Sequence, residues 1–149
     1  MIILKDSIRN EISETLEKAK NVFVSSIDAM GYPNTKAMFA LKHEGLTTHF
    51  LSTNLSAKRT KQFLSNPKAC IYFCDEAEFR GLMLIGEMQV CTDREHKAML
   101  WKDGFEIYYP QGIDDEDYCV LKFTAHRGNY YHGLENNTFV MEEFEYGKD

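Results

Sequence analysis

Positive charge in this sequence is concentrated in one polar stretch that lies between two apolar runs. The stretch is STNLSAKRTKQFLSNP, residues 52–67, and it holds three cations within four positions: Lys58, Arg59 and Lys61. Cations at this density attract anions, and the planar guanidinium of Arg59 can hold a phosphate through two hydrogen bonds, which a lysine cannot do. The alternative interpretation is a basic helix face that contacts solvent. The stretch therefore raises the question of a local phosphate site in a chain whose formal charge is −6.

The same stretch predicts a short helix whose N-terminus would lie beside the cations. The spacing of its apolar residues fits a helix, Ser56 is the expected N-cap, and Asn66-Pro67 would end it. A helix N-terminus offers unpaired backbone N–H groups and partial positive charge to an anion. Thr53 and Ser56 would add hydroxyl donors to the same site.

Two further features could serve the same ligand, and each also has a plain structural interpretation. Lys36 lies in the middle of an expected strand, where a lysine either points to solvent or reaches the anion held by Lys58 and Arg59. A set of aromatic residues could form the wall of a site for a planar ligand or could fill the core. This set comprises Trp101, Phe105, Tyr108, Tyr109, Tyr130 and Tyr131.

Composition and charge argue against several other kinds of function. The formal charge of −6 disfavours general nucleic-acid binding, which needs a broad basic surface. No apolar run is long enough for a transmembrane helix, and the first apolar run is too short for a signal peptide. We therefore expect a cytoplasmic protein that binds neither nucleic acid nor membrane.

The cysteines and histidines show no spacing typical of a metal site. The cysteines Cys70, Cys74, Cys91 and Cys119 contain no CxxC pair, and the five histidines form no HxxxH or HExxH pattern. We expect four reduced thiols in the core and no metal ion. No P-loop, GxSxG or paired-carboxylate signature is present, so the sequence indicates no catalytic residue.

Apolar periodicity predicts a mainly β (α+β) fold. Helices are expected at residues 6–20, 56–67 and 94–105, the first capped by Asp6 or Ser7. Strands are expected at 21–29, 34–42, 46–53, 68–75, 79–93 and 119–133, with turns at Met30-Gly31 and at 43–45, and the tail from residue 134 could add one more strand. The first three strands are joined by short turns and should form a meander. Short connections and few helices favour an antiparallel sheet of six or seven strands, closed into a small barrel with helices outside it.

The stretch STNLSAKRTKQFLSNPKACIYF resembles the flavin-phosphate segment of the pyridoxamine 5′-phosphate oxidase-like split-barrel superfamily. That segment reads roughly Tyr-Thr-Asn, a short gap, Ser-Arg-Lys, a helical turn ending in Asn-Pro, and then an apolar strand. Ser52 and Thr53 take the Tyr-Thr places, and Asn66-Pro67 falls at the matching distance. Lys58 and Arg59 take the Arg-Lys places with the two cations exchanged.

Other segments resemble the superfamily in the right order, from about residue 20 to residue 134. YPNTKAMFAL is similar to a strand whose arginine reaches the FMN phosphate, and Lys36 stands in that place. RGLMLIGEMQV is similar to the fifth strand, but Gly81 replaces a glutamine that contacts the flavin. NYYHG is similar to the Phe-Trp-Gln-Gly segment, which puts Tyr131 at the tryptophan place near the flavin.

The resemblance also has a clear departure. True pyridoxamine phosphate oxidases continue with an Arg-Leu-His-type segment and a C-terminal extension that hold the substrate. Here Gly133 is followed by LENNTFVMEEFEYGKD, which contains neither arginine nor histidine. The chain is therefore more similar to the short general-stress-protein branch, and pyridoxamine phosphate is not its expected substrate.

The resemblance implies a single FMN-binding split-barrel domain over residues 1–149, and a homodimer with FMN at the subunit interface. It implies a cytoplasmic flavoprotein oxidoreductase in which the protein orients the flavin ring. The residues implied at the phosphate are Lys36, Thr53, Ser56, Lys58 and Arg59. Those implied at the ring or ribityl chain are Ala37, Met38, Phe39 and Ser52, with Tyr131 near the flavin.

Two alternatives remain open at the level of sequence. The protein could bind FMN without turnover, as a carrier or sensor, which Gly81 and the missing substrate segment favour. The barrel could instead bind haem, a deazaflavin or no ligand, which Lys36 in place of arginine favours.

Overall fold

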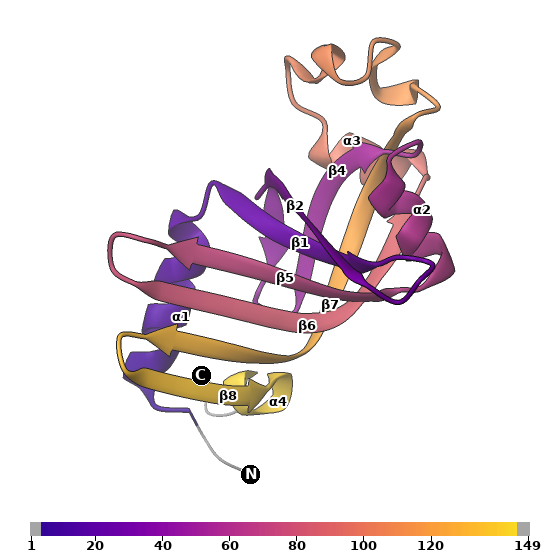
Figure 1. Ribbon diagram of the computed structural model, residues 1–149. Coiled ribbons are helices and arrows are strands. Elements are labelled where there is room, and N and C mark those ends of the chain that lie inside the picture. Colours follow the sequence, from indigo (N-terminus) through magenta and orange to yellow (C-terminus); the bar gives the residue numbers. More distant parts are fainter. Residues whose placement is uncertain (1–3, 146–149) are drawn as a thin grey trace.

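The structure, a computed structural model, describes residues 4–145 and consists of one curled antiparallel sheet with helices around it (Figure 1). Its strands are β1 (Asn21–Ile27), β2 (Pro33–Phe39), β3 (Lys42–Glu44), β4 (Thr48–Asn54), β5 (Lys68–Asp75), β6 (Arg80–Cys91), β7 (Tyr118–His132) and β8 (Glu135–Val140). Its helices are α1 (Asp6–Lys18), α2 (Lys58–Ser65), α3 (Arg94–Leu100) and α4 (Met141–Glu145), with single 3₁₀ turns at Phe105–Ile107 and Gly112–Asp114.

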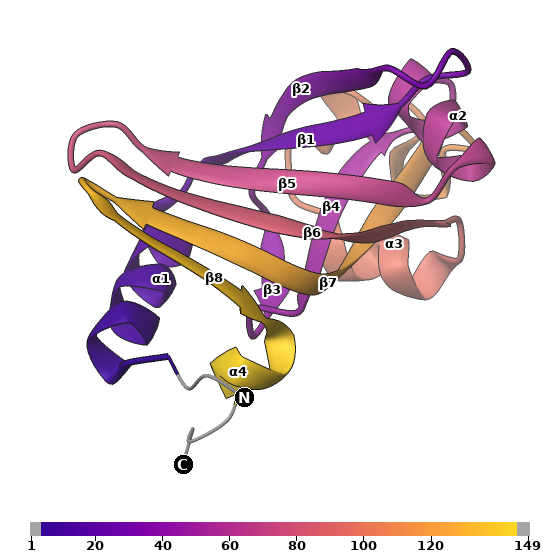
Figure 2. The ribbon, with the colours of Figure 1, turned by 60° about the horizontal axis from the view of Figure 1, so that its bottom comes forward.

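The order of the strands across the sheet is β2-β1-β5-β6-β7-β4-β3, and β8 pairs with one end of β7. The long strands β6 and β7 bend where their register shifts between Ile85 and Gly86. One end of β7 therefore pairs with β8 and the other with β4, which turns β4 away from β5 and opens the sheet into a half-barrel (Figures 1 and 2). The predicted fold class, a mainly β split barrel with flanking helices, is confirmed.

Gly86 shows why the bend needs a glycine. A Cβ atom added to Gly86 would lie 1.9 Å from the backbone oxygen of Thr124 on β7. Only a residue without a side chain permits this approach.

The predicted meander is wrong, because the expected strand 34–42 ends at Phe39 and a separate strand, β3, lies where a turn was expected at 43–45. β2 pairs with β1, whereas β3 pairs with β4, and the two hairpins lie at opposite ends of the strand order. The chain leaves the first hairpin after Phe39, and the N–H of Ala40 donates to the carbonyl of Lys20. β2 thereby becomes the edge of the sheet that lies across the opening from β4.

The core is built from one face of the sheet and from α1, which lies against it (Figure 2). Alternate residues of β1, Val22 and Val24, are buried, and α1 contributes Ile8, Ile12 and Leu16 at helical spacing. Neither Asp6 nor Ser7 caps α1, because Lys5 holds the N-cap position and no side chain bonds there. A second, smaller core lies under α3 and contains Phe50, Cys91, Leu100, Tyr109, Tyr118 and Val120.

The C-terminal part of the chain continues the sheet. The extra strand expected in the tail is confirmed as β8, and it is followed by the short helix α4, which the sequence did not predict. The last residues of the expected acidic end, 146–149, lie outside the described residues. Among residues 4–145, no helix is both long enough and apolar enough to cross a membrane.

Candidate functional site

A cavity of about 340 Å³ opens where the edge strand β2 faces β4 across the mouth of the half-barrel. The helix α2 and the segment 105–109 close its other sides. Six of the ten residues expected at the cofactor line this cavity: Ala37, Met38, Phe39, Ser52, Thr53 and Arg59. Five further residues complete the lining: Asn21, Asn54, Phe105, Tyr108 and Tyr109.

Arg59 supplies the positive charge of the cavity. It lies on the first turn of α2, and its Nε atom is buried without a hydrogen-bond partner among residues 4–145. Burial lowers the pKa of Arg59, whereas the neighbouring Tyr109 and Cys119 raise it, and the guanidinium stays protonated. No carboxylate in the described part of the chain pairs with this guanidinium.

Thr53 holds a second polar atom that lacks a partner. Its side chain is 2% exposed, and no group within residues 4–145 forms a hydrogen bond with its Oγ1 atom. A buried hydroxyl without a partner costs about 1–3 kcal/mol. Thr53 and Arg59 therefore hold two unsatisfied donors just beneath the wall of one cavity, and an anion with several oxygens would satisfy both.

Aromatic side chains form another part of the lining. Tyr109 is buried and stacks on Tyr118, with 4.4 Å between ring centroids. Burial raises the pKa of Tyr109, so its phenol is neutral. Tyr108 is half exposed and lies 6.5 Å from the Phe39 ring across the cavity.

Some of the aromatic residues noted in the sequence line the cavity, and others fill the core. Phe105, Tyr108 and Tyr109 line the cavity, whereas Tyr130 is fully buried in the main core. The three lining residues were not assigned to the cofactor from the sequence. Their clustering within five positions was the one signal that could have included them.

Ser56 does not cap α2, and its donors already have a partner. α2 begins at Lys58, with Ala57 in the N-cap position and no side-chain bond there. The backbone N–H and the hydroxyl of Ser56 both donate to the carboxylate of Asp117, at 2.8 and 3.0 Å. Burial raises the pKa of Asp117, but hydrogen bonds from Asn54 and Ser56 outweigh it and lower the pKa overall.

Three other residues expected at the cofactor lie elsewhere in this subunit. Lys58 lines a separate hollow with Lys61 and residues 27–29, on the far side of α2. Lys36 is exposed on β2 opposite Val24. Tyr131 lies on β7 opposite Gly81, with its ring edge against Phe79 at 5.7 Å.

The position of Gly81 is already filled by a neighbouring side chain. A Cβ atom added to Gly81 would lie 1.8 Å from the hydroxyl of Tyr72 on β5. Tyr72 thus occupies the space that a longer side chain at position 81 would need.

The four cysteines are unpaired thiols, but they are not all in the core. Cys91 and Cys119 are buried, Cys70 is half-buried and Cys74 is exposed. The expectation of four core thiols is therefore wrong for Cys74, because Cys70 and Cys74 lie on the outward face of β5.

Comparison with models of protein families identifies the family of the chain. The family model described as pyridoxamine 5′-phosphate oxidase matches residues 8–132, which is most of the sequence. The chain belongs to the pyridoxamine 5′-phosphate oxidase family. The resemblance stated from the sequence motifs is thereby confirmed, whereas no curated protein sequence matches the chain.

Several solved structures share the fold. A protein from Clostridium acetobutylicum related to general stress protein 26 is 47% identical, with a TM-score of 0.85, and the match covers 95% of this chain and 99% of that one. A NimC/NimA family protein from the same organism is 23% identical with a TM-score of 0.68, covering 88% and 91%. A heme binding protein from Mycobacterium smegmatis is 18% identical with a TM-score of 0.73, covering 95% of this chain and 61% of that one. The last two likenesses concern the fold alone.

Proposed function

We propose that this protein binds FMN in the cavity between β2 and β4 and acts as an FMN-dependent oxidoreductase. The observation that carries the proposal is the pair of buried, unpartnered polar atoms at Thr53 and Arg59. Few ligands offer several anionic oxygens joined to a large planar ring, and this cavity has a cationic end and an aromatic wall. The proposed domain spans residues 1–149 as one unit.

The phosphate of FMN would lie at Arg59 and Thr53. Each hydrogen bond to the phosphate would satisfy a group that now has no partner. Hydrogen bonds from a guanidinium to phosphate are charge-assisted and stronger than neutral ones. Arg59 forms no ion pair with a carboxylate among residues 4–145, so phosphate binding would not have to break one.

The flavin ring would lie along the edge strand β2. Since β2 pairs with β1 on one side and is the edge of the sheet on the other, part of its backbone N–H and C=O groups can bond to the polar edge of a ring. Ala37, Met38 and Phe39 provide this edge, and the Tyr108 ring faces Phe39. Bound FMN would supply hydride or electron transfer, while these residues orient it and exclude water.

We further propose a homodimer that completes the site. The outward face of β1, β5 and β6 carries Phe23, Tyr72 and Met83 in one row across the ladder, and Phe23 is 43% exposed. In Figures 1 and 2 no helix lies over this face of β5 and β6. Exposed apolar rows of this kind mark interfaces. Tyr131 shares this face and lies away from its own cavity, so it would reach the flavin of a partner subunit.

The second candidate function is ligand binding without turnover. Burial raises the pKa of Tyr109 and of Cys119, the two acids near Arg59, so both are neutral and neither is poised as a base. Haem is another candidate ligand, because a heme binding protein has a similar fold. A deazaflavin cofactor that carries a phosphate is a third candidate. The unpartnered Arg59 favours a ligand with an anionic group, which FMN supplies as a phosphate and haem as carboxylates, so the absorption spectrum decides between them.

The visible absorption spectrum of the purified protein tests the ligand. The proposal predicts a flavin spectrum, or its appearance on adding FMN; a haem spectrum with no FMN uptake would contradict it. Anaerobic addition of NADH or NADPH then tests the activity, since bleaching of the flavin followed by reoxidation over many cycles indicates an enzyme. A flavin that stays oxidised with both donors supports a carrier or sensor. We expect this chemistry in the cytoplasm, where the four thiols stay reduced.

A further inference from the structure

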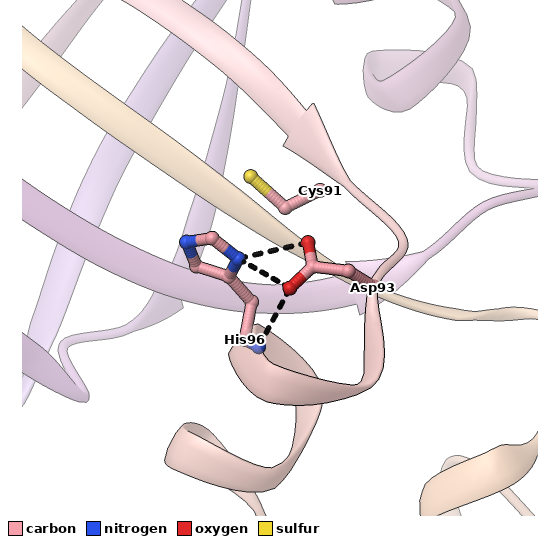
Figure 3. Close-up of side chains that lie close together, drawn as sticks. All are labelled: Cys91, Asp93 and His96. Carbon is pink, nitrogen blue, oxygen red and sulfur yellow. Dashed lines mark hydrogen bonds and ion pairs between the residues drawn. The ribbon is translucent and has the colours of Figure 1, made fainter.

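The turn between β6 and α3 brings together three side chains of the types that bind transition metals. Cys91 is the last residue of β6, Asp93 precedes the first turn of α3, and His96 lies on that turn (Figure 3). One ligand atom from each, a sulfur, a carboxylate oxygen and a ring nitrogen, lies within 4.8 Å of the others. The site lies outside the proposed flavin cavity, and the inference from it does not rest on the proposed function.

The helix cap explains only part of this arrangement. Asp93 accepts the backbone N–H of His96 at 3.1 Å, which is an ordinary N-cap bond. The imidazole adds to this, since its Nδ1 atom lies 2.8 Å from both carboxylate oxygens. The cap requires neither a histidine at position 96 nor a thiol at position 91 facing the same space.

We propose that Cys91, Asp93 and His96 bind one divalent transition-metal ion of the zinc type. Thiolate and imidazole suit zinc and its neighbours, whereas magnesium and calcium prefer sites made of oxygen alone. The ion replaces the thiol proton of Cys91 and becomes the partner of the Asp93 carboxylate in place of the imidazole N–H. Three protein ligands leave a fourth position for water or a small ligand.

The distances allow this with small movements. Bond lengths of about 2.3 Å to sulfur and about 2.0 Å to nitrogen and oxygen give ligand-to-ligand separations of about 3.3–3.5 Å in a tetrahedron. The three ligand atoms lie within 4.8 Å of one another, so the widest separation must shorten by at most roughly 1.3–1.5 Å, which side-chain rotation can provide. The Asp93 side chain is 53% exposed, so the ion has a path from solvent.

The charges around the site act in both directions. The carboxylate of Asp93 attracts a divalent cation. Burial raises the pKa of the Cys91 thiol, so the ion must displace the thiol proton, and the ammonium of Lys122 lies close enough to Cys91 to oppose the ion. Two negative ligands with one opposing cation leave a net attraction. The Phe50 ring packs near the imidazole of His96, with 6.0 Å between the ring centroids.

A bound ion would also stabilise the wall of the proposed flavin cavity. Cys91 belongs to the small core that contains Leu100 and Tyr109, so the ion would tie the end of β6 to α3. α3 in turn holds the segment that follows it, since the ammonium of Lys97 donates to the Asp115 carbonyl at 3.0 Å. Metal binding should therefore raise the thermal unfolding midpoint.

Titration of the reduced, metal-free protein with Co²⁺ tests the proposal. Difference spectra against the same sample without metal cancel any flavin absorption. We expect one Co²⁺ per chain, a thiolate-to-cobalt charge-transfer band in the near ultraviolet, and its loss when one equivalent of Zn²⁺ is added. Cys91→Ser should abolish the band, whereas Cys74→Ser, which changes an exposed thiol elsewhere, should keep it.

A second variant keeps the test valid if Cys91→Ser does not fold. Asp93→Asn retains an N-cap side chain but loses the negative ligand, so the Kd for Co²⁺ should rise about tenfold or more. Absence of the band in the wild-type protein would overturn the proposal. A band that persists in Cys91→Ser, or that disappears in Cys74→Ser, would also overturn it. So would an unchanged Kd for Co²⁺ in Asp93→Asn.

Discussion

Thr53 on β4 and Arg59 on α2 line the same cavity, and each holds a buried polar atom with no hydrogen-bond partner among residues 4–145. These unsatisfied donors therefore lower the stability of the ligand-free protein, and they are available to bind an anion. This relationship gives a sharper prediction than charge alone, because stability and binding should respond in opposite directions.

Thr53→Val tests that opposition. Valine has nearly the same shape, so the variant removes the unsatisfied hydroxyl without opening a cavity. The ligand-free protein should be unchanged or more stable, by up to about 1 kcal/mol, and FMN should bind more weakly by about 0.5–1.5 kcal/mol. Urea unfolding and calorimetric titration measure the two quantities. A variant that loses stability but keeps its FMN affinity would assign Thr53 a structural role.

Arg59→Ala should weaken FMN binding by about 1.5–3 kcal/mol, the usual range for a hydrogen bond to a charged group. Lys58→Ala is the matched comparison, because the neighbouring lysine lines a different hollow. Its effect should stay below about 1 kcal/mol, the range of an exposed charge. Equal losses in the two variants would show that general positive potential holds the phosphate. Loss of ligand-free stability in Arg59→Ala with unchanged affinity would show a structural role.

His49 should make the protein sensitive to mild acid. Burial lowers the pKa of His49 to about 4; the Leu46 carbonyl opposes this shift and nearby His43 adds to it. Because the folded pKa lies below the ordinary value of 6.5, the unfolded chain takes up the proton first. The stability from neutral His49 is full above about pH 6.5 and is lost between about pH 6.5 and 4, for a total of roughly 3 kcal/mol.

The check is urea unfolding from pH 7.5 to 4 for the wild type and His49→Gln. The glutamine amide can still donate to the Leu46 carbonyl, but it does not titrate. The difference in unfolding free energy between the two proteins should therefore shrink as pH falls. His126→Gln, which changes an exposed imidazole, should follow the wild-type slope. Parallel curves for wild type and His49→Gln would contradict the prediction.

FMN binding and dimerisation should be linked if the partner subunit completes the site. A ligand that binds the dimer better than the monomer must stabilise the dimer. Sedimentation velocity across a dilution series should show a lower dimer dissociation constant with FMN, and flavin should be released as dimers dissociate. Phe23→Lys, on the proposed interface, should weaken both association and FMN binding. A monomer that keeps full flavin occupancy at every concentration would leave each cavity complete within one chain.

Much of the fold follows from local patterns, because helical and strand periodicity are properties of neighbouring residues. The stripe of Ile8, Ile12 and Leu16 and the alternation around Val22 and Val24 predicted their elements correctly. The break between β2 and β3 was missed, since alternation looks the same along one long strand or two short ones. The two strands pair with different neighbours, β1 before them and β4 after them, and the chain turns between them where the N–H of Ala40 donates to the Lys20 carbonyl.

The candidate site was predicted in part for the same reason. The motif placed Thr53 and Arg59 correctly in one cavity, because both lie on a single strand-to-helix connection. It also grouped Ser56 with them, but Ser56 donates to Asp117, sixty-one positions later, which no local spacing reveals. Tyr108 and Tyr109 reach the cavity by a long-range approach of the segment after α3, so their role could not be read from the motif.

The most direct measurement is calorimetric titration of the ligand-free protein with FMN and with riboflavin, which lacks the phosphate. The account predicts that FMN binds more tightly by at least about 1.5–3 kcal/mol, because a charge-assisted bond to Arg59 is lost with riboflavin. It also predicts that Arg59→Ala reduces this preference and that Lys58→Ala does not. Equal affinity of the wild-type protein for FMN and riboflavin would contradict the assignment of Thr53 and Arg59 as the phosphate site.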